Sequence, residues 1–74
     1  MMMFDLPYAP DEEGAYPLSI NESPPLRFSS RQAALSYAVK LANQRAEHGK
    51  DYAINLEGGD GKWRLFQGRA RMRA

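Results

Sequence analysis

The sequence predicts a small α+β domain, in which an antiparallel sheet of three or four strands carries one helix on one face. Residues 30–48 place apolar side chains at helical spacing, which predicts the helix. Residues 15–20, 52–57 and 62–67 alternate apolar with other side chains, as half-buried strands do. A glycine-rich link at residues 58–61 joins the last two runs as a hairpin. The expected order is strand, short strand, helix, strand, strand.

The length and composition favour one domain without covalent or metal staples. The chain has 74 residues and no cysteine, so neither disulfides nor thiolate metal sites are available. A domain of this size buries only about two-thirds of its unfolded surface, so its stability depends on a small core or on association. We expect a single domain over residues 15–68, flanked by an arm at residues 1–14 and a tail at residues 69–74.

The first 14 residues are expected to form a flexible acidic arm. They hold two prolines, an Asp-Glu-Glu run and a glycine, with no sustained helical or alternating pattern. An alternative is a short strand, because Phe4, Leu6 and Tyr8 alternate at a period of two. Pro7 would restrict such a strand to the edge of a sheet, in this molecule or in a neighbouring one.

The next two strands are predicted from alternation and turn residues. Tyr16, Leu18 and Ile20 share one face of the first strand, with Pro17 on the other face. Residues 21–25 contain turn-forming types, and residues 26–28 are long enough for a short second strand that closes a hairpin.

The helix has recognisable start and stop signals. Ser29 and Gln32 fit a capping box, so the helix is expected to begin near Ser30 and to stop at Gly49. The core-facing stripe is expected to contain Ala34, Leu35, Ala38, Leu41 and Ala42.

The last strand is expected to place Trp63 and Leu65 in the core, following a four-residue hairpin loop. Phe66 would then share the second face with Lys62 and Arg64. One helix covers only one face of a sheet, so this second face must be polar, partnered or dimerised.

Charge is distributed unevenly along the chain. Residues 1–28 carry five acids and one base, a net charge of −4, whereas the remainder carries nine bases and four acids, a net of +5. Five of these bases follow Gly61, with no acid among them. They and Phe66 are the candidate binding residues: Lys62, Arg64, Phe66, Arg69, Arg71 and Arg73.

The sequence carries no enzyme signature. The loop at residues 58–62 lacks the spacing of a phosphate-binding loop and lies between strands instead of opening a helix. His48, the single histidine, is placed to complement the helix C-terminus. We therefore predict no catalytic residue, no metal site and no cofactor.

Two binding functions remain. The favoured one is protein recognition or pairing with a second copy through the open sheet face. The alternative is nucleic-acid binding, with the basic residues on phosphates and Trp63 or Phe66 stacking on bases. No apolar stretch approaches the roughly 20 residues of a membrane span, so the expected location is cytoplasmic. The layout of residues 28–67 resembles small bacterial and phage domains, a resemblance that implies no function.

Overall fold

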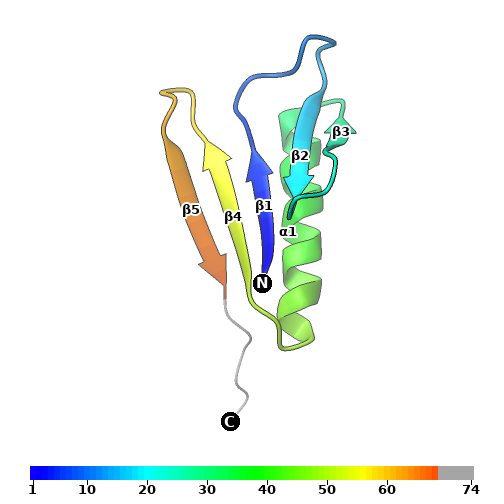
Figure 1. The fold of residues 1–74 in the computed structure, drawn as a ribbon, viewed down its shortest axis with the longest axis vertical. Helices are drawn as coiled ribbons and strands as arrows, with labels where there is room; N and C mark the ends of the chain where they lie inside the picture. The colour runs from blue at the N-terminus through cyan, green and yellow to red at the C-terminus, as the bar shows by residue number, and fades with distance from the viewer. Residues whose placement is uncertain (69–74) are drawn as a thin grey trace.

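The protein is a five-stranded sheet with one helix packed against one face (Figure 1). A computed structural model describes residues 1–68. The strands lie side by side in the order β3-β2-β1-β4-β5. The elements along the chain are β1 (Met2–Leu6), β2 (Tyr16–Ile20), β3 (Leu26–Phe28), α1 (Arg31–Glu47), β4 (Tyr52–Glu57) and β5 (Trp63–Gly68).

The predicted α+β class, the single helix and its order relative to the later strands are confirmed. The sheet itself differs, because it has five strands and is mixed. β1 runs parallel to β4, while β1–β2, β2–β3 and β4–β5 are antiparallel pairs. Across the described residues, no helix is both long and apolar enough to cross a membrane.

The largest correction concerns the first residues of the chain. The expectation of an irregular arm is wrong for Met2–Leu6, which form the central strand β1 between β2 and β4. Placing this strand at an edge because of Pro7 was also wrong. Pro7 follows the last residue of β1, so the missing proline N–H interrupts no ladder inside the strand.

The core lies between the sheet and α1. Phe4, Leu6 and Leu18 are completely buried side chains on the helix side of β1 and β2. They meet a stripe of small residues on α1, formed by Ala34, Ala38 and Ala42. Methyl-sized side chains let the helix axis approach the sheet closely, so large side chains from the strands fill the interface. Leu35 and Leu41 flank the stripe and are partly buried.

The helix runs over Arg31–Glu47, one residue shorter at each end than the predicted 30–48, and it stops before Gly49 as expected. Ser30, not Ser29, is the N-cap, because its Oγ accepts a hydrogen bond from the N–H of Ala33 at 3.0 Å. At the other end Gly49 adopts a φ of +74°, and the N–H of Lys50 donates to the carbonyl of Arg45 at 2.9 Å. This is a Schellman termination, which requires the left-handed conformation that glycine adopts without strain.

Candidate protein-docking edge at strand β5

The β4–β5 hairpin turns through a tight loop at residues 58–62. The N–H of Gly58 donates to the carbonyl of Lys62, and the N–H of Gly61 donates to the carbonyl of Gly58, both at 2.9 Å. Gly61 has a φ of +79°. A turn followed by a left-handed glycine is the usual three-residue hairpin connection, with a bulge at that glycine.

This loop places the side chains of β5 on the opposite faces from those predicted. Glu57 pairs with Trp63 and Asn55 pairs with Leu65, so Trp63 and Leu65 lie on the face that α1 does not cover. Phe66 pairs with Ile54, a core residue, and therefore lies on the helix side. The prediction assumed a four-residue loop that made Lys62 the first strand residue. The Gly58–Lys62 pair instead closes a three-residue loop and sets Trp63 opposite Glu57, and a shift of one residue exchanges the two faces.

Lys62 therefore lies in the loop, and Arg64 shares the helix side with Phe66 instead of the open face. The remaining candidate binding residues lie outside the described part of the chain: Arg69, Arg71 and Arg73.

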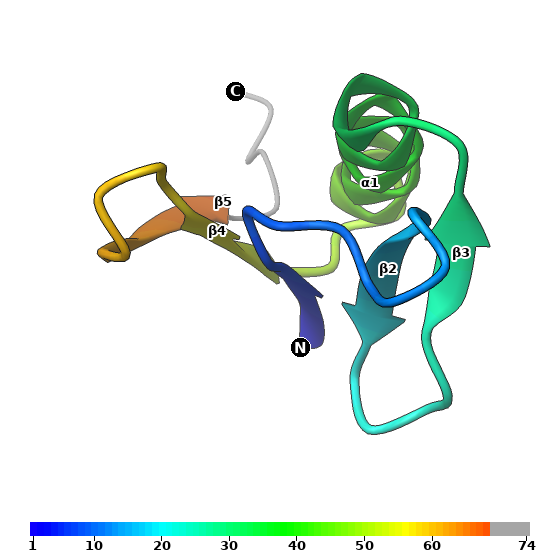
Figure 2. The same ribbon diagram turned by 90° about the horizontal axis from the view of Figure 1, so that it is seen from above.

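Both faces of β5 are exposed. The exposed fractions are 51% for Trp63, 53% for Leu65 and 51% for Phe66. Phe66 is exposed although it lies on the helix side, because α1 packs over β1, β2, β3 and β4. Figure 2 shows β5 extending away from the helix at the far end of the sheet. Three large apolar side chains thus stand in solvent on one six-residue strand.

The outer edge of β5 also carries unpaired backbone groups. Hydrogen-bonded pairs alternate along an antiparallel ladder, and Gly58 with Lys62 is one such pair. By the same alternation, the amides of Arg64 and Phe66 point to β4, and those of Trp63, Leu65 and Gln67 point outward. Within the described residues no strand lies on that side of β5. These outward N–H and C=O groups form a template for an added strand.

The basic residues beside this edge are partly neutralised. Arg64 Nη2 lies 3.4 Å from Asp60 Oδ2, in an exposed ion pair. The backbone N–H of Lys62, 3.0 Å from Asp60 Oδ1, holds the pKa of Asp60 below its usual value, and Arg64 lowers it further. On the open face, Trp63 lies opposite Glu57. The surroundings of Trp63 are therefore mixed in charge.

Sequence reasoning assigned Trp63 and Leu65 to the core and named Trp63 as a contact residue only in the nucleic-acid alternative, so it missed Leu65 and the open-face position of both. Their alternation was correctly recognised, but it does not say which face is buried. The signal that would have found them is the Gly-Gly-Asp-Gly run, because a left-handed glycine at its last position is typical of a three-residue bulged loop, which shifts the pairing register by one residue.

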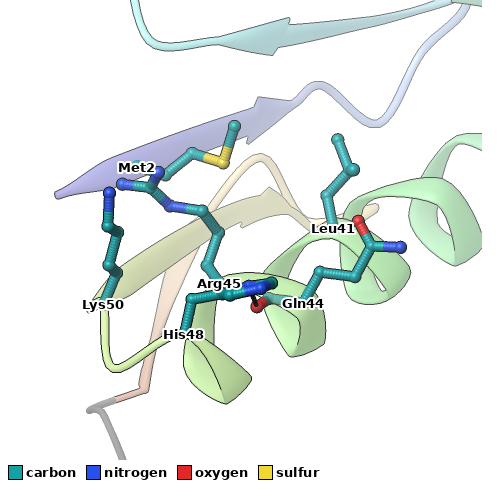
Figure 3. Close-up of a pocket in the computed structure, with 6 residues that line it drawn as sticks. All are labelled: Met2, Leu41, Gln44, Arg45, His48 and Lys50. Carbon is teal, nitrogen blue, oxygen red and sulfur yellow. Dashed lines mark hydrogen bonds between the residues drawn. The ribbon is translucent and has the colours of Figure 1, made fainter.

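Apart from the β5 edge, a concavity of about 210 Å³ lies between the end of α1 and the start of β1 (Figure 3). Its lining combines two apolar side chains, one amide and three basic side chains: Met2, Leu41, Gln44, Arg45, His48 and Lys50. His48 Nδ1 lies 2.8 Å from the carbonyl oxygen of Gln44 in the last turn of α1, so this ring nitrogen binds the helix end. No carboxylate lines the concavity, and no group of three or more potential metal ligands occurs among the described residues.

No family model matches the chain, and no curated protein or solved structure matches it either.

Proposed function

We propose that this chain is a protein-binding module that receives an extended strand of a partner along the outer edge of β5. The observation that carries the proposal is the coincidence of two unsatisfied features on one strand. Outward-pointing backbone groups supply hydrogen bonds to any extended chain, and half-exposed Trp63, Leu65 and Phe66 supply apolar contact on both faces.

Binding of a partner strand would be stabilised mainly by burial of the apolar side chains of β5. Large apolar side chains contribute about 25 cal/mol for each Å² removed from water. Aromatic residues carry much of the binding energy at protein interfaces, and Trp63 and Phe66 stand at the two faces of the same strand. Backbone pairing fixes the direction and register of the added strand, while these side chains select its sequence.

Nucleic-acid binding is supported less well by the described residues. Exposure of Trp63 makes it available for stacking, yet Glu57 lies opposite it and Asp5 lies on the same open face. Arg64 is already paired with Asp60. A phosphate backbone would meet carboxylates beside the stacking residue, so protein is the better-supported ligand.

The proposal is tested by selecting displayed short peptides on the immobilised protein at high dilution. We expect enrichment of extended, alternating apolar sequences that bind the parent chain and lose at least tenfold in affinity for Leu65→Lys. A lysine on an edge strand blocks strand addition, and Leu65 is exposed enough for the monomer to tolerate it.

The matched control is Val39→Lys, which makes the same type of change at an exposed position on α1 and should leave peptide binding unchanged. An absence of enriched peptides, or peptides that bind both variants equally, would contradict the proposal. Oligonucleotide binding that weakens steeply with salt and is abolished by Arg64→Glu would favour the nucleic-acid function instead.

A further inference from the structure

We infer that the strand received by β5 is the β5 of a second copy, paired antiparallel about a two-fold axis through Leu65. This inference rests on the proposed function and names its partner. The resulting dimer has a continuous sheet in which the two copies of β5 are adjacent central strands. Three observations support this occupant: the direction of the outward amides, the side-chain matches that the two-fold axis creates, and the absence of protective residues on β5.

The outward amides match each other in this arrangement. With Leu65 opposite the partner's Leu65, Trp63 lies opposite the partner's Gln67, and Gln67 lies opposite the partner's Trp63. All three residues carry amides that point away from β4, as the Gly58–Lys62 hydrogen bond indicates. Each opposed pair can therefore exchange both of its backbone hydrogen bonds, and the outward groups of Trp63, Leu65 and Gln67 are all satisfied.

The open face becomes a continuous apolar stripe across the axis. Leu65 contacts the partner's Leu65, and Trp63 is the diagonal neighbour of the partner's Leu65 on the same face. These side chains are about half exposed in the single chain, so the pairing removes apolar area from water without moving any core residue.

The helix side is matched by charge and aromatic contact. Arg64 lies opposite the partner's Phe66, and Phe66 lies opposite the partner's Arg64. A guanidinium over an aromatic ring is a favourable cation–π arrangement, and the two-fold axis would make it twice if each Arg64 exchanges its exposed ion pair with Asp60 for this contact. Since α1 packs over β1 to β4, Figure 2 shows the helix side of β5 clear of α1, where these contacts would form.

Moving the two-fold axis by one residue in either direction gives a less favourable pairing of β5 with its copy. An axis through Arg64 sets Arg64 against the partner's Arg64, and like charges directly opposite are destabilising. An axis through Phe66 sets Trp63 against position 69 of the partner, which lies outside the described residues. Only the Leu65 register pairs all three outward residues within the strand.

β5 also lacks the devices that keep edge strands apart. Its sequence, Trp-Arg-Leu-Phe-Gln-Gly, contains no proline and no acidic residue, and its single charge lies on the helix side. A two-fold contact buries the same patch on both copies, so one exposed strand is satisfied completely without a second kind of protein.

The first measurement is mass by light scattering over a range of concentration. We expect a transition from 8.4 kDa to twice that mass, shifted at least tenfold to higher concentration by Leu65→Lys and left in place by Val39→Lys. A single-chain mass at every concentration would overturn the inference, as would a dimer that Leu65→Lys does not weaken.

The second measurement tests the register by oxidative cross-linking, which is clean because the chain has no cysteine of its own. Leu65→Cys should form a disulfide-linked dimer, because opposed residues of a hydrogen-bonded pair have Cα atoms about 5.5 Å apart, within disulfide range. Gln67→Cys is the control. Its two copies would lie four residues apart along the strands, about 14 Å, and should not cross-link.

A mixture in which Leu65→Cys links to Gln67→Cys, while Leu65→Cys alone does not link, would place the axis at Phe66 and overturn the Leu65 register. Failure of the inference is distinguishable from failure of the proposed function. A chain that stays monomeric but enriches strand-like peptides sensitive to Leu65→Lys keeps the docking edge and loses only the second copy as its occupant.

Discussion

The two edges of the sheet are built on opposite principles. β3 has three residues and follows Pro24 and Pro25, so it offers little backbone for pairing. Its central residue, Arg27, is held by Asp11 at 2.9 Å and Glu13 at 3.0 Å. β5 is twice as long and presents apolar side chains on both faces.

The difference between the β3 and β5 edges indicates where another strand could pair with the sheet. A small domain gains stability from every strand it can add, yet each exposed edge also invites uncontrolled pairing. In this chain the β3 edge is protected by the ion pairs of Arg27, by the two preceding prolines and by contact with the helix. The helix contact is made by Phe28 at the end of β3, which packs on Tyr37 of α1 with ring centroids 5.3 Å apart. Among the described residues the outer edge of β5 stays uncovered, so under the proposed function an added strand would pair with β5.

The strongest test of this comparison removes the same side chain at the centre and at the open edge. Phe4→Ala should lower the free energy of unfolding by about 3–5 kcal/mol, because Phe4 is completely buried in the central strand. Phe66→Ala should cost about 1 kcal/mol or less, because half of that ring is already in water. Urea unfolding of both variants, made in a Leu65→Lys background to prevent pairing, measures the two values. Equal losses would mean that β5 is packed as tightly as β1.

A smaller effect is expected from the hairpin that fixes the faces of β5. Gly61→Ala should cost about 1–2 kcal/mol, because Gly61 has a φ of +79°, while a Cβ there meets no atom within 4 Å. The cost is therefore one of backbone conformation alone. Gly61→Asn is the control, since asparagine tolerates the left-handed region better and should recover part of the loss. Amide hydrogen exchange in β5 should accelerate in Gly61→Ala more than in Gly61→Asn, and identical behaviour of the two would rule out the bulged loop.

The junction between the protected edge and the helix provides the next test. Ser30→Ala should lower the free energy of unfolding by about 1 kcal/mol, because it removes the acceptor of the Ala33 N–H. Ser29→Ala should change it by less than about 0.5 kcal/mol. Thermal unfolding followed by circular dichroism separates the two, and a larger loss for Ser29→Ala would show that the cap lies one residue earlier.

The smallest effect is expected from the ion pair between Asp11 and Arg27 of β3. The N–H of Ala15 donates to Asp11 Oδ1 and, with Arg27 adding to it, lowers the pKa of Asp11 from the usual 3.8. A depressed pKa in the folded state adds stability that is complete above pH 3.8 and is lost as the pH falls through the folded-state value. The free energy of unfolding, measured as a function of pH, should therefore fall less steeply at acid pH in Asp11→Asn than in the parent chain. Glu12→Gln, at a neighbouring acid, should leave this pH dependence unchanged. If Asp11→Asn loses stability at acid pH to the same extent as the parent chain, the Asp11 carboxylate does not stabilise the β3 edge.

The sequence predicted those elements whose patterns are local. The α1 stripe, the alternation in β2 and β4 and the stop at Gly49 all depend on neighbours within a few positions, and all are confirmed. β1 was missed as a central strand because Met2–Leu6 is short and is followed by proline, glycine and acidic residues. Its place is decided by residues far along the chain, which local alternation does not report.

The candidate site was only partly anticipated, for a related reason. Phe66 and Arg64 were predicted as binding residues, and both are exposed on β5, while their binding role stays a prediction. Trp63 and Leu65 were assigned to the core, because apolar alternation looks the same on a covered face and on an open one. A three-residue loop closed by Gly58 and Lys62, in place of the expected four-residue loop, decided between the faces. Phe66 is exposed because the single helix packs over β1 to β4.

The central position of β1 also constrains how the molecule folds. β1 pairs with β4 over Met2–Leu6 and Tyr52–Leu56, so contacts such as Phe4 with Ile54 join residues 50 positions apart. The β2–β3 hairpin and α1 depend on short-range contacts and can form early, whereas this pairing must wait for closure of a long loop. During synthesis, Phe4 and Leu6 therefore lack one side of their pocket until β4 has left the ribosome.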